Sequence, residues 1–293
     1  MADVVPALPP DLTLPILPEP LIRFNRRSSD PEVTLSELAS ILDQDASLTC
    51  ELLKSVNNSA GGRRSKATTT LHALSLLGVK RVRLLVLSTA IERQASEHNS
   101  PLVFARLFVR ANLERALFAQ QVAGRLRADV DLAFAAGLMQ DFLLPVLTRE
   151  LLVLYSDFIE KLRHGGPDLS FREKTSLGWD HAEAAAHVMA GWGFPDELVC
   201  CVRMHHRVDD VTADARLRDS AAAAVAISSL LPDPIRQCPQ GIDRLGALCR
   251  DDYGFDPIEL AGIVDELMLE QLGNASREPT LTQRLLTAMP AAV

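Results

Sequence analysis

The stretch Gly178–Arg207, GWDHAEAAAHVMAGWGFPDELVCCVRMHHR, decides the fold, because its apolar residues recur at helical spacing on both sides of one break. The break is Gly193–Pro195, and proline is well tolerated in the first turn of a following helix. Asp180 can cap the helix before the break. The stretch also contains the only adjacent histidine pair, His205-His206. We therefore expect two helices whose histidines can meet in space.

The remainder of the chain predicts helices as well, because no period-2 alternation of useful length occurs. Thr34-Leu35-Ser36-Glu37 has the pattern of a capping box. The fold class we predict is therefore all-α, a helical bundle. The expected helices are a short one ending near Arg26-Arg27, one from Leu38, Ala46–Val56, one capped by Thr70 and stopped by Gly78, Val79–Glu92, Leu102–Leu126, Leu132–Gln140, a segment after Pro145, Ser220–Leu231 and Asp256–Leu272, before a weakly specified tail.

We divide the chain into an extended, proline-rich segment 1–12, an N-terminal helical part 13–98 and a second helical subdomain 99–293. Ser100-Pro101 marks the boundary between the two helical parts. A chain of 293 residues is long enough to bury the cores of two packed subdomains. This division predicts a crevice between them.

Composition points to a cytoplasmic protein. The five cysteines form no CxxC pair, which favours reduced thiols over a disulfide framework. The N-terminus lacks the pattern of a signal peptide, and no uninterrupted apolar run has the length of a membrane span. The net charge of −8 argues against nonspecific binding to nucleic acid or an anionic membrane.

Charge is unevenly distributed, however. Between Glu51 and Glu92 there is no acidic residue but there are seven basic ones, including Arg63, Arg64, Lys80 and Arg81. A basic surface of this kind could bind a small anionic ligand or an acidic face of another protein. The alternative is a solvated helix face that pairs with carboxylates elsewhere, and ordinary protein surfaces favour that interpretation.

Four residues could form a metal site: Asp141, His181, His205 and His206. Imidazole and carboxylate groups that converge on a cation can lower the pKa of a bound water. On a helix, His205 and His206 would lie about 100° apart, so that one could face Asp141 while the other faces elsewhere. The alternative is that these side chains only hydrogen-bond to one another, and spacing alone favours it. The chain contains no HExxH, GxSxG, GxxxxGK[ST] or GxGxxG motif.

Two groups of residues resemble the HDOD domain, the HD-related output domain of bacterial signalling. The first is Leu14-Pro15, Leu38-Ala39-Ser40-Ile41, Asp45, Leu48-Thr49, Leu52-Leu53, Asn57, Ser59 and Leu76-Leu77-Gly78. The second is Ala135–Asp141, Trp179-Asp180-His181, Trp192–Pro195 and His205-His206. The resemblance covers about Leu14 to Arg207, and it rests on the order and spacing of these motifs.

The resemblance implies an all-α relative of the HD phosphohydrolases, which include the HD-GYP cyclic-di-GMP phosphodiesterases. In catalytic relatives a His-Asp doublet supplies metal ligands, and here the doublet reads Gln140-Asp141. A further histidine would fall near Arg110–Leu113 and a further carboxylate near Ser228-Ser229, and both are missing. Asp141, His181, His205 and His206 would then be the remnant of a metal site. We expect no cofactor, or a divalent Fe, Mn or Zn ion if that remnant is occupied.

The function we predict is that of a stand-alone, non-catalytic HDOD protein of bacterial signal transduction. Its partner would be a signalling protein or a small anionic ligand, bound through Arg63, Arg64, Lys80 and Arg81. The first alternative is a degenerate metal-dependent phosphohydrolase acting on a nucleotide or phosphoester. The second is nucleic-acid binding through region 52–91, which the excess of acidic residues in the chain makes less favourable.

Overall fold

The computed structural model describes residues 8–9, 18–28, 30–59, 66–97, 100–164, 166–272 and 278–289, and every regular element within them is a helix. The all-α prediction is therefore confirmed. Most of segment 1–12, as well as Leu14-Pro15, lies outside these residues. The helices are α1 (Glu19–Arg27), α2 (Leu35–Leu42), α3 (Ala46–Ser59), α4 (Thr70–Glu97), α5 (Ala105–Leu126), α6 (Val130–Met139), α7 (Leu144–Glu150), α8 (Leu152–Arg163), α9 (Leu169–Leu177), α10 (His181–Gly191), α11 (Asp196–Met204), α12 (Val208–Ala213), α13 (Ala221–Ser228), α14 (Gly241–Ala247), the π-helix η1 (Leu248–Asp252), α15 (Pro257–Leu272) and α16 (Leu281–Ala288).

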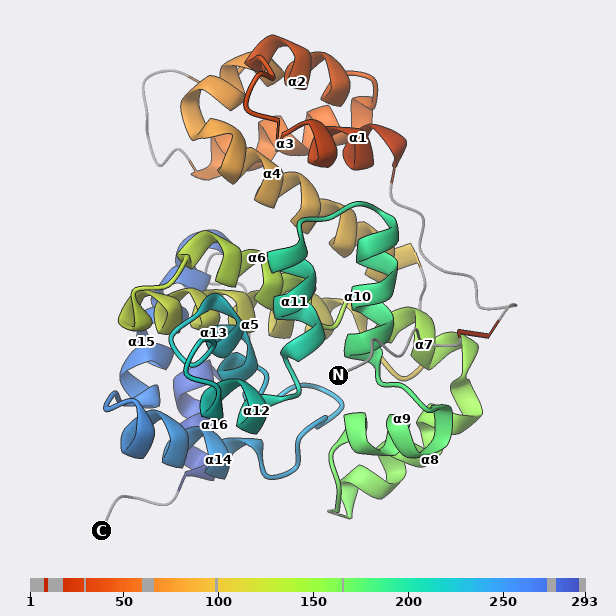
Figure 1. Ribbon diagram of the computed structural model, residues 1–293, viewed down its shortest axis with the longest axis vertical. Coiled ribbons are helices and arrows are strands. Elements are labelled where there is room, and N and C mark those ends of the chain that lie inside the picture. Colours follow the sequence, from red (N-terminus) through yellow and green to blue (C-terminus); the bar gives the residue numbers. More distant parts are fainter. Residues whose placement is uncertain are drawn as a thin grey trace.

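Helices α1 to α3 and the first turns of α4 form a small N-terminal lobe, from which α4 runs down to the larger lobe (Figure 1). Helix α4 is interrupted at Gly78, whose backbone has φ 79° and ψ 158°. A side chain would strain that conformation, so glycine suits this position. The predicted helix stop at Gly78 is thus a kink, beyond which α4 packs against α5 and α6.

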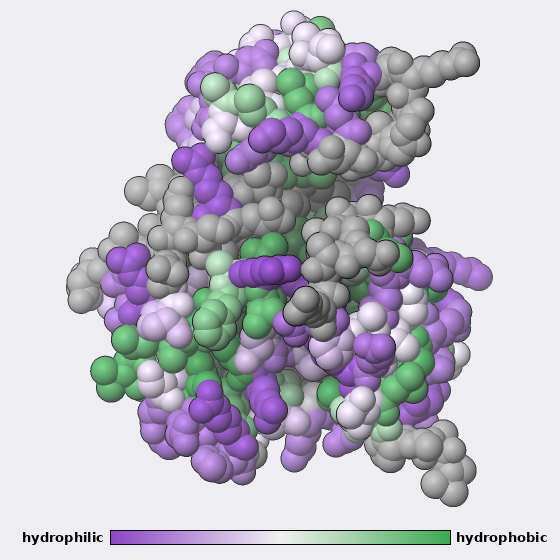
Figure 2. Space-filling model, turned by 180° about the vertical axis from the view of Figure 1, so that it is seen from behind, coloured by the Kyte–Doolittle hydropathy of each residue, from purple (hydrophilic) through white to green (hydrophobic). Residues whose placement is uncertain are grey.

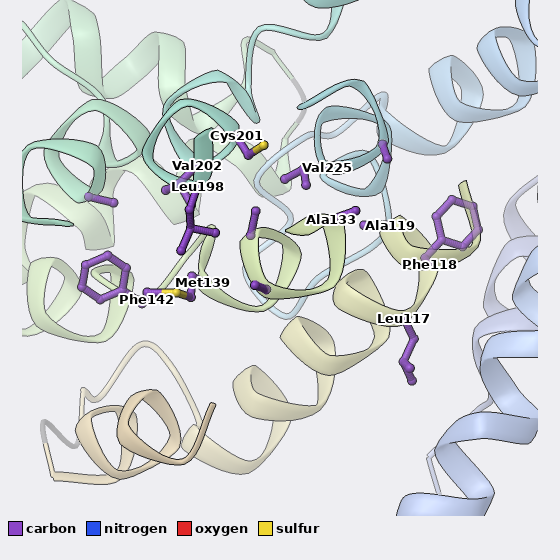
Figure 3. Packing of buried hydrophobic residues seen from close by; sticks show 14 of the residues in the cluster. Leu117, Phe118, Ala119, Ala133, Met139, Phe142, Leu198, Cys201, Val202 and Val225 are labelled. Carbon is purple, nitrogen blue, oxygen red and sulfur yellow. The ribbon is translucent and has the colours of Figure 1, made fainter. Parts of the chain in front are cut away.

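Helix α6 lies at the centre of the larger lobe, where it packs against α5, α11 and α13. Small residues let these helices approach closely: a Cβ atom at Gly137 would lie 2.9 Å from the Ala116 Cα atom of α5. Figure 3 shows Ala119 and Ala133 near this contact, with Leu198 extending from α11 toward α6. This tight packing fixes the end of α6, where Asp141 follows.

The two lobes also meet at the turn between α10 and α11. The Asn25 side-chain amide of α1 lies 3.5 Å from the Gly193 carbonyl oxygen, to which it donates a hydrogen bond. Gly193 has φ 74°, and a Cβ atom there would lie 2.6 Å from Arg26 Nε. The positive φ therefore favours glycine at this turn, and a side chain here would also displace Arg26.

The helix starts predicted from capping residues were partly right. The predicted capping box of Thr34 and Glu37 is present. The prediction that Thr70 caps the next helix was wrong, because the Thr69 hydroxyl accepts the His72 amide. Thr70 instead donates to the Asp43 carboxylate at 2.5 Å. The C-terminal tail is also better specified than expected, since Thr280 and Gln283 form a capping box that starts α16.

One segment, Val130–Glu150, is long and apolar enough by composition to cross a membrane. It comprises α6, a turn and α7, and 78% of its most apolar window is buried inside the fold. That burial is typical of a core helix. Figure 2 shows hydrophilic residues over both the small and the large lobe on one face of the molecule.

Candidate functional site

Three chain segments bring the candidate ligands together. Asp141 lies in the turn between α6 and α7. His181 is the first residue of α10, which begins at a capping box of Asp180 and Glu183. His205 and His206 lie in the turn directly after α11. The helix pair predicted from the sequence therefore places His181 and the His205-His206 pair at the same end.

The four candidate residues form one cluster, in which one ligand atom from each lies within 4.8 Å of all the others. His181 Nε2 is 3.2 Å from Asp141 Oδ1, and His205 Nε2 is 3.5 Å from the same oxygen. His206 Nε2 is 2.8 Å from His181 Nε2. The expectation that one of the paired histidines faces elsewhere was wrong, because both contribute a ligand atom to the cluster.

A second set of contacts fixes the imidazole rings. His181 Nδ1 donates to Glu173 Oε2 at 2.7 Å, and His205 Nδ1 donates to the Val202 carbonyl oxygen at 2.7 Å. Glu173 also accepts the Tyr155 hydroxyl at 2.6 Å and the His181 amide at 3.0 Å. Carboxylate and carbonyl partners of this kind fix the tautomer of a metal-binding histidine. Because these contacts use Nδ1 of His181 and His205, Nε2 of each ring faces Asp141.

The other carboxylate oxygen of Asp141 faces Arg115 of α5. A guanidinium nitrogen of Arg115 contacts Asp141 Oδ2, and the Gln237 amide donates to the same oxygen at 3.2 Å. Arg115 also contacts Asp233 Oδ2 at 3.1 Å. Asp141 is thus shared between a histidine side and an arginine side.

Protonation in the cluster follows from burial and from these charges. Burial alone would raise the pKa of Asp141, but the Arg115 charge, the hydrogen bond from His181 and the nearby His205 hold it well below the usual range. Burial alone would lower the pKa of His181, but Glu173 and Asp141 raise it to about 10. Burial and repulsion from His205 and His181 lower the pKa of His206 well below its usual value. His181 therefore carries a proton near neutral pH.

The positions at which the HDOD resemblance predicts lost ligands have structural roles. The Gln140 amide donates to the Gly137 carbonyl oxygen at 3.1 Å, within its own helix end. The Ser229 hydroxyl donates to the His205 carbonyl oxygen at 2.8 Å, and the Ser228 hydroxyl to the Val225 carbonyl oxygen at 2.8 Å. Neither serine can replace a carboxylate ligand. Asn112 of α5 is buried beside Arg115.

The residues present fit a single transition-metal ion. His205 Nε2 is buried and has no hydrogen-bond partner among the described residues, although it faces Asp141. Three imidazoles and one carboxylate are the donor types that Zn, Fe and Mn accept in proteins. Asp141, His181, His205 and His206 would hold such an ion, whose charge would replace the proton on His181.

The predicted basic surface is only partly described. Arg63 and Arg64 lie outside the described residues, as does the side chain of Lys80. Arg81 lies on α4 directly after the kink at Gly78, and its side chain is exposed.

Several residues that hold the cluster were missed by sequence reasoning. They are Arg115, Tyr155, Glu173, Asp233 and Gln237, all of them buried or nearly so. They lie on helices and loops far apart in the sequence, and no local motif includes them. The only signal that could have indicated them is the position of polar residues among the apolar ones of predicted core helices, as for Arg115 in α5.

Comparisons with solved structures support the fold. A Shewanella amazonensis protein whose name proposes a phosphohydrolase is 20% identical with a TM-score of 0.67, covering 93% of this chain and 95% of its own. An HDOD domain protein of unknown function from Geobacter sulfurreducens is 17% identical with a TM-score of 0.59, covering 94% and 88%. A Marinobacter aquaeolei protein whose name proposes a role in signal transduction is 22% identical with a TM-score of 0.61, covering 89% and 58%.

Among curated proteins, an "uncharacterized protein" of Treponema pallidum is 22% identical over 237 residues. This chain spans about half the length of that relative, 45%, and the match includes 78% of this chain. A family model of the HDOD domain matches residues 14–208, which include the small lobe, the larger lobe up to the start of α12 and all four residues of the cluster. The chain therefore belongs to the HDOD domain family.

Proposed function

We propose that this protein is a non-catalytic regulatory protein of signal transduction in the bacterial cytoplasm. It acts by binding a partner protein or a small anionic ligand rather than by hydrolysis. Membership of the HDOD family supports this function, as does the signal-transduction role that the name of the Marinobacter relative proposes. The chemistry of the His/Asp cluster supports the absence of hydrolysis.

The observation that carries the proposal is the burial and internal neutralisation of Asp141. The relative accessibilities of Asp141, His181 and His205 are 1%, 0% and 0%. One oxygen of Asp141 faces the histidines, and Arg115 and Gln237 engage the other. Metal-dependent hydrolysis of a phosphoester needs open coordination positions for water and for a substrate oxygen. Three of the four residues of the cluster are closed to solvent in this way and only His206 is partly exposed, which supports a non-catalytic role.

A phosphohydrolase is the second candidate, because four suitable ligand atoms lie within 4.8 Å of one another. The two functions are separated by an activity assay with p-nitrophenyl phosphate, bis(p-nitrophenyl) phosphate and a cyclic dinucleotide. We expect the protein supplied with Mn²⁺, Fe²⁺ or Zn²⁺ to hydrolyse each no faster than its Asp141→Asn variant. Hydrolysis that the wild type catalyses and this variant does not would establish the enzyme instead.

The surface that we propose for the ligand is the basic one, which includes Arg63, Arg64, Lys80 and Arg81. Support comes from the exposure of Arg81 beside the Gly78 kink. In the Lys80→Glu/Arg81→Glu variant, affinity for pyrophosphate should fall about tenfold or more, because two attractive charges become repulsive. Isothermal titration calorimetry measures this, and unchanged affinity would remove the surface from the proposal. Arg125→Glu, on an exposed arginine of α5, is the matched control.

A further inference from the structure

Oxygen atoms that accept hydrogen bonds surround the buried side chain of Arg115. Its side chain is 3% exposed, and the side chains of its two carboxylate partners, Asp141 and Asp233, are 1% and 4% exposed. The same guanidinium faces two backbone carbonyl oxygens, those of Ser229 at 3.4 Å and Leu231 at 3.2 Å. Four oxygen atoms from two separate parts of the chain, Asp141 and residues 229–233, thus surround one positive charge.

An oxygen shell of this kind is what a divalent cation requires. Carboxylate and carbonyl oxygens are the ligands that Mg²⁺ and Mn²⁺ prefer. Two buried carboxylates close to a single cation are also unstable without that cation, since isolated buried charge is costly. Here the protein itself supplies the positive charge, from the middle of α5.

A small cavity completes the arrangement on the arginine side. It has a volume of about 10 Å³, and Asn112, Arg115, Asp141, Asp233 and Gln237 contribute its polar lining. Among the described residues, the Asn112 amide, Arg115 Nε and Gln237 Oε1 have no hydrogen-bond partner. The cavity lining therefore contains both unpaired hydrogen-bond donors and unpaired acceptors, and the cavity has room for about one water molecule. The cavity is too small for a phosphate group.

We propose that the Arg115 guanidinium is a built-in cation that replaces a divalent ion between Asp141 and Asp233. Any metal that the protein binds is then a single ion on the histidine side of Asp141. A guanidinium has no open coordination position and cannot activate water as a metal does. This inference goes beyond the proposed function, since it concerns how many cations the site accepts and does not depend on any partner.

The test is the number of Mn²⁺ ions that each variant binds, measured by equilibrium dialysis and elemental analysis. The wild type should bind at most one ion per chain. Arg115→Met keeps an unbranched, flexible side chain, shortens it and removes its charge, and it should bind one ion more than the wild type. Arg115→Lys keeps the charge and should bind the wild-type number. Arg110→Met, the same change five residues earlier in α5, is the control for effects of lost arginine charge.

A second substitution locates the additional ion. Asp233→Asn in the Arg115→Met background removes one of the two carboxylates, so the additional ion should be lost. If Arg115→Met folds poorly without metal, Mn²⁺ should restore its folding. Arg115→Met that binds no more Mn²⁺ than the wild type, or that stays unfolded in its presence, would overturn the proposal. Because no phosphoester is involved, this result is independent of the hydrolysis assay.

Discussion

Replacing Arg115 with methionine is expected to lower the free energy of unfolding by about 3–5 kcal/mol when divalent metal is absent. The reason is that Asp141 and Asp233 would remain buried, close to each other, without the charge that they share. Breaking a buried ion pair by removing one partner is costly in this way, although the intact pair contributes little net stability. Urea denaturation in the presence of EDTA measures the difference.

The matched control is Arg110→Met on the same helix. Arg110 pairs with Glu114 at 3.0 Å, and Glu114 keeps a second partner, Arg284, when Arg110 is changed. We expect this variant to lose clearly less stability than Arg115→Met, because Arg284 still neutralises Glu114. Adding Asp233→Asn to Arg115→Met should recover part of the loss, because it removes one of the two unpaired carboxylates. Equal losses in Arg115→Met and Arg110→Met would show that the Arg115 charge is not needed.

Glu173→Gln is expected to have the second large effect, and this effect depends on pH. In the folded protein burial would lower the pKa of His181, but Glu173 and Asp141 raise it to about 10. In the unfolded chain the pKa of a histidine is near 6.5. Each unit of difference between the folded and unfolded pKa corresponds to about 1.4 kcal/mol of stability. The proton on His181 therefore stabilises the fold fully below pH 6.5, and this contribution is lost as the pH rises toward 10.

Removing the Glu173 charge should bring the pKa of His181 down. We expect the Glu173→Gln variant to be less stable than the wild type near neutral pH and to lose less stability between pH 6.5 and pH 10. Denaturation curves at several pH values in EDTA measure both effects. The pKa of His206 in the folded protein is lowered, so His206 titrates below this range and does not affect the comparison.

Glu183→Gln serves as the control for Glu173→Gln, because Glu183 is a carboxylate of the same capping region that does not contact the His181 imidazole. Its pH dependence should match that of the wild type. If the Glu173→Gln variant lost as much stability as the wild type between pH 6.5 and pH 10, Glu173 would not be what holds the proton on His181.

The features that were predictable from the sequence depend on neighbours along the chain. The Asp180 helix cap and the Gly193 turn are examples, because hydrogen bonds or backbone angles within a few residues decide them. The chemistry of their side chains already named Asp141, His181, His205 and His206 as one candidate set, and the HDOD resemblance interpreted this set as the remnant of a metal site. The structure brings these four residues together.

What the sequence did not predict depends on contacts between distant segments. Arg115 meets Asp141 and Asp233 across 26 and 118 positions of the chain. Glu173 contacts His181 only because α9 turns back on α10, and no motif marks that turn. The orientation of the His205-His206 pair was predicted wrongly for a related reason: α11 ends at Met204, and tertiary packing brings both side chains to Asp141 and His181.

The most direct test of a closed, internally neutralised site is a crystal structure of the protein grown with Mn²⁺, with data collected at the manganese absorption edge. We predict that Arg115 stays between Asp141 and Asp233. We also predict at most one anomalous peak, among Asp141 Oδ1 and the three histidines. A second manganese peak between Asp141 and Asp233, with Arg115 displaced, would contradict the account.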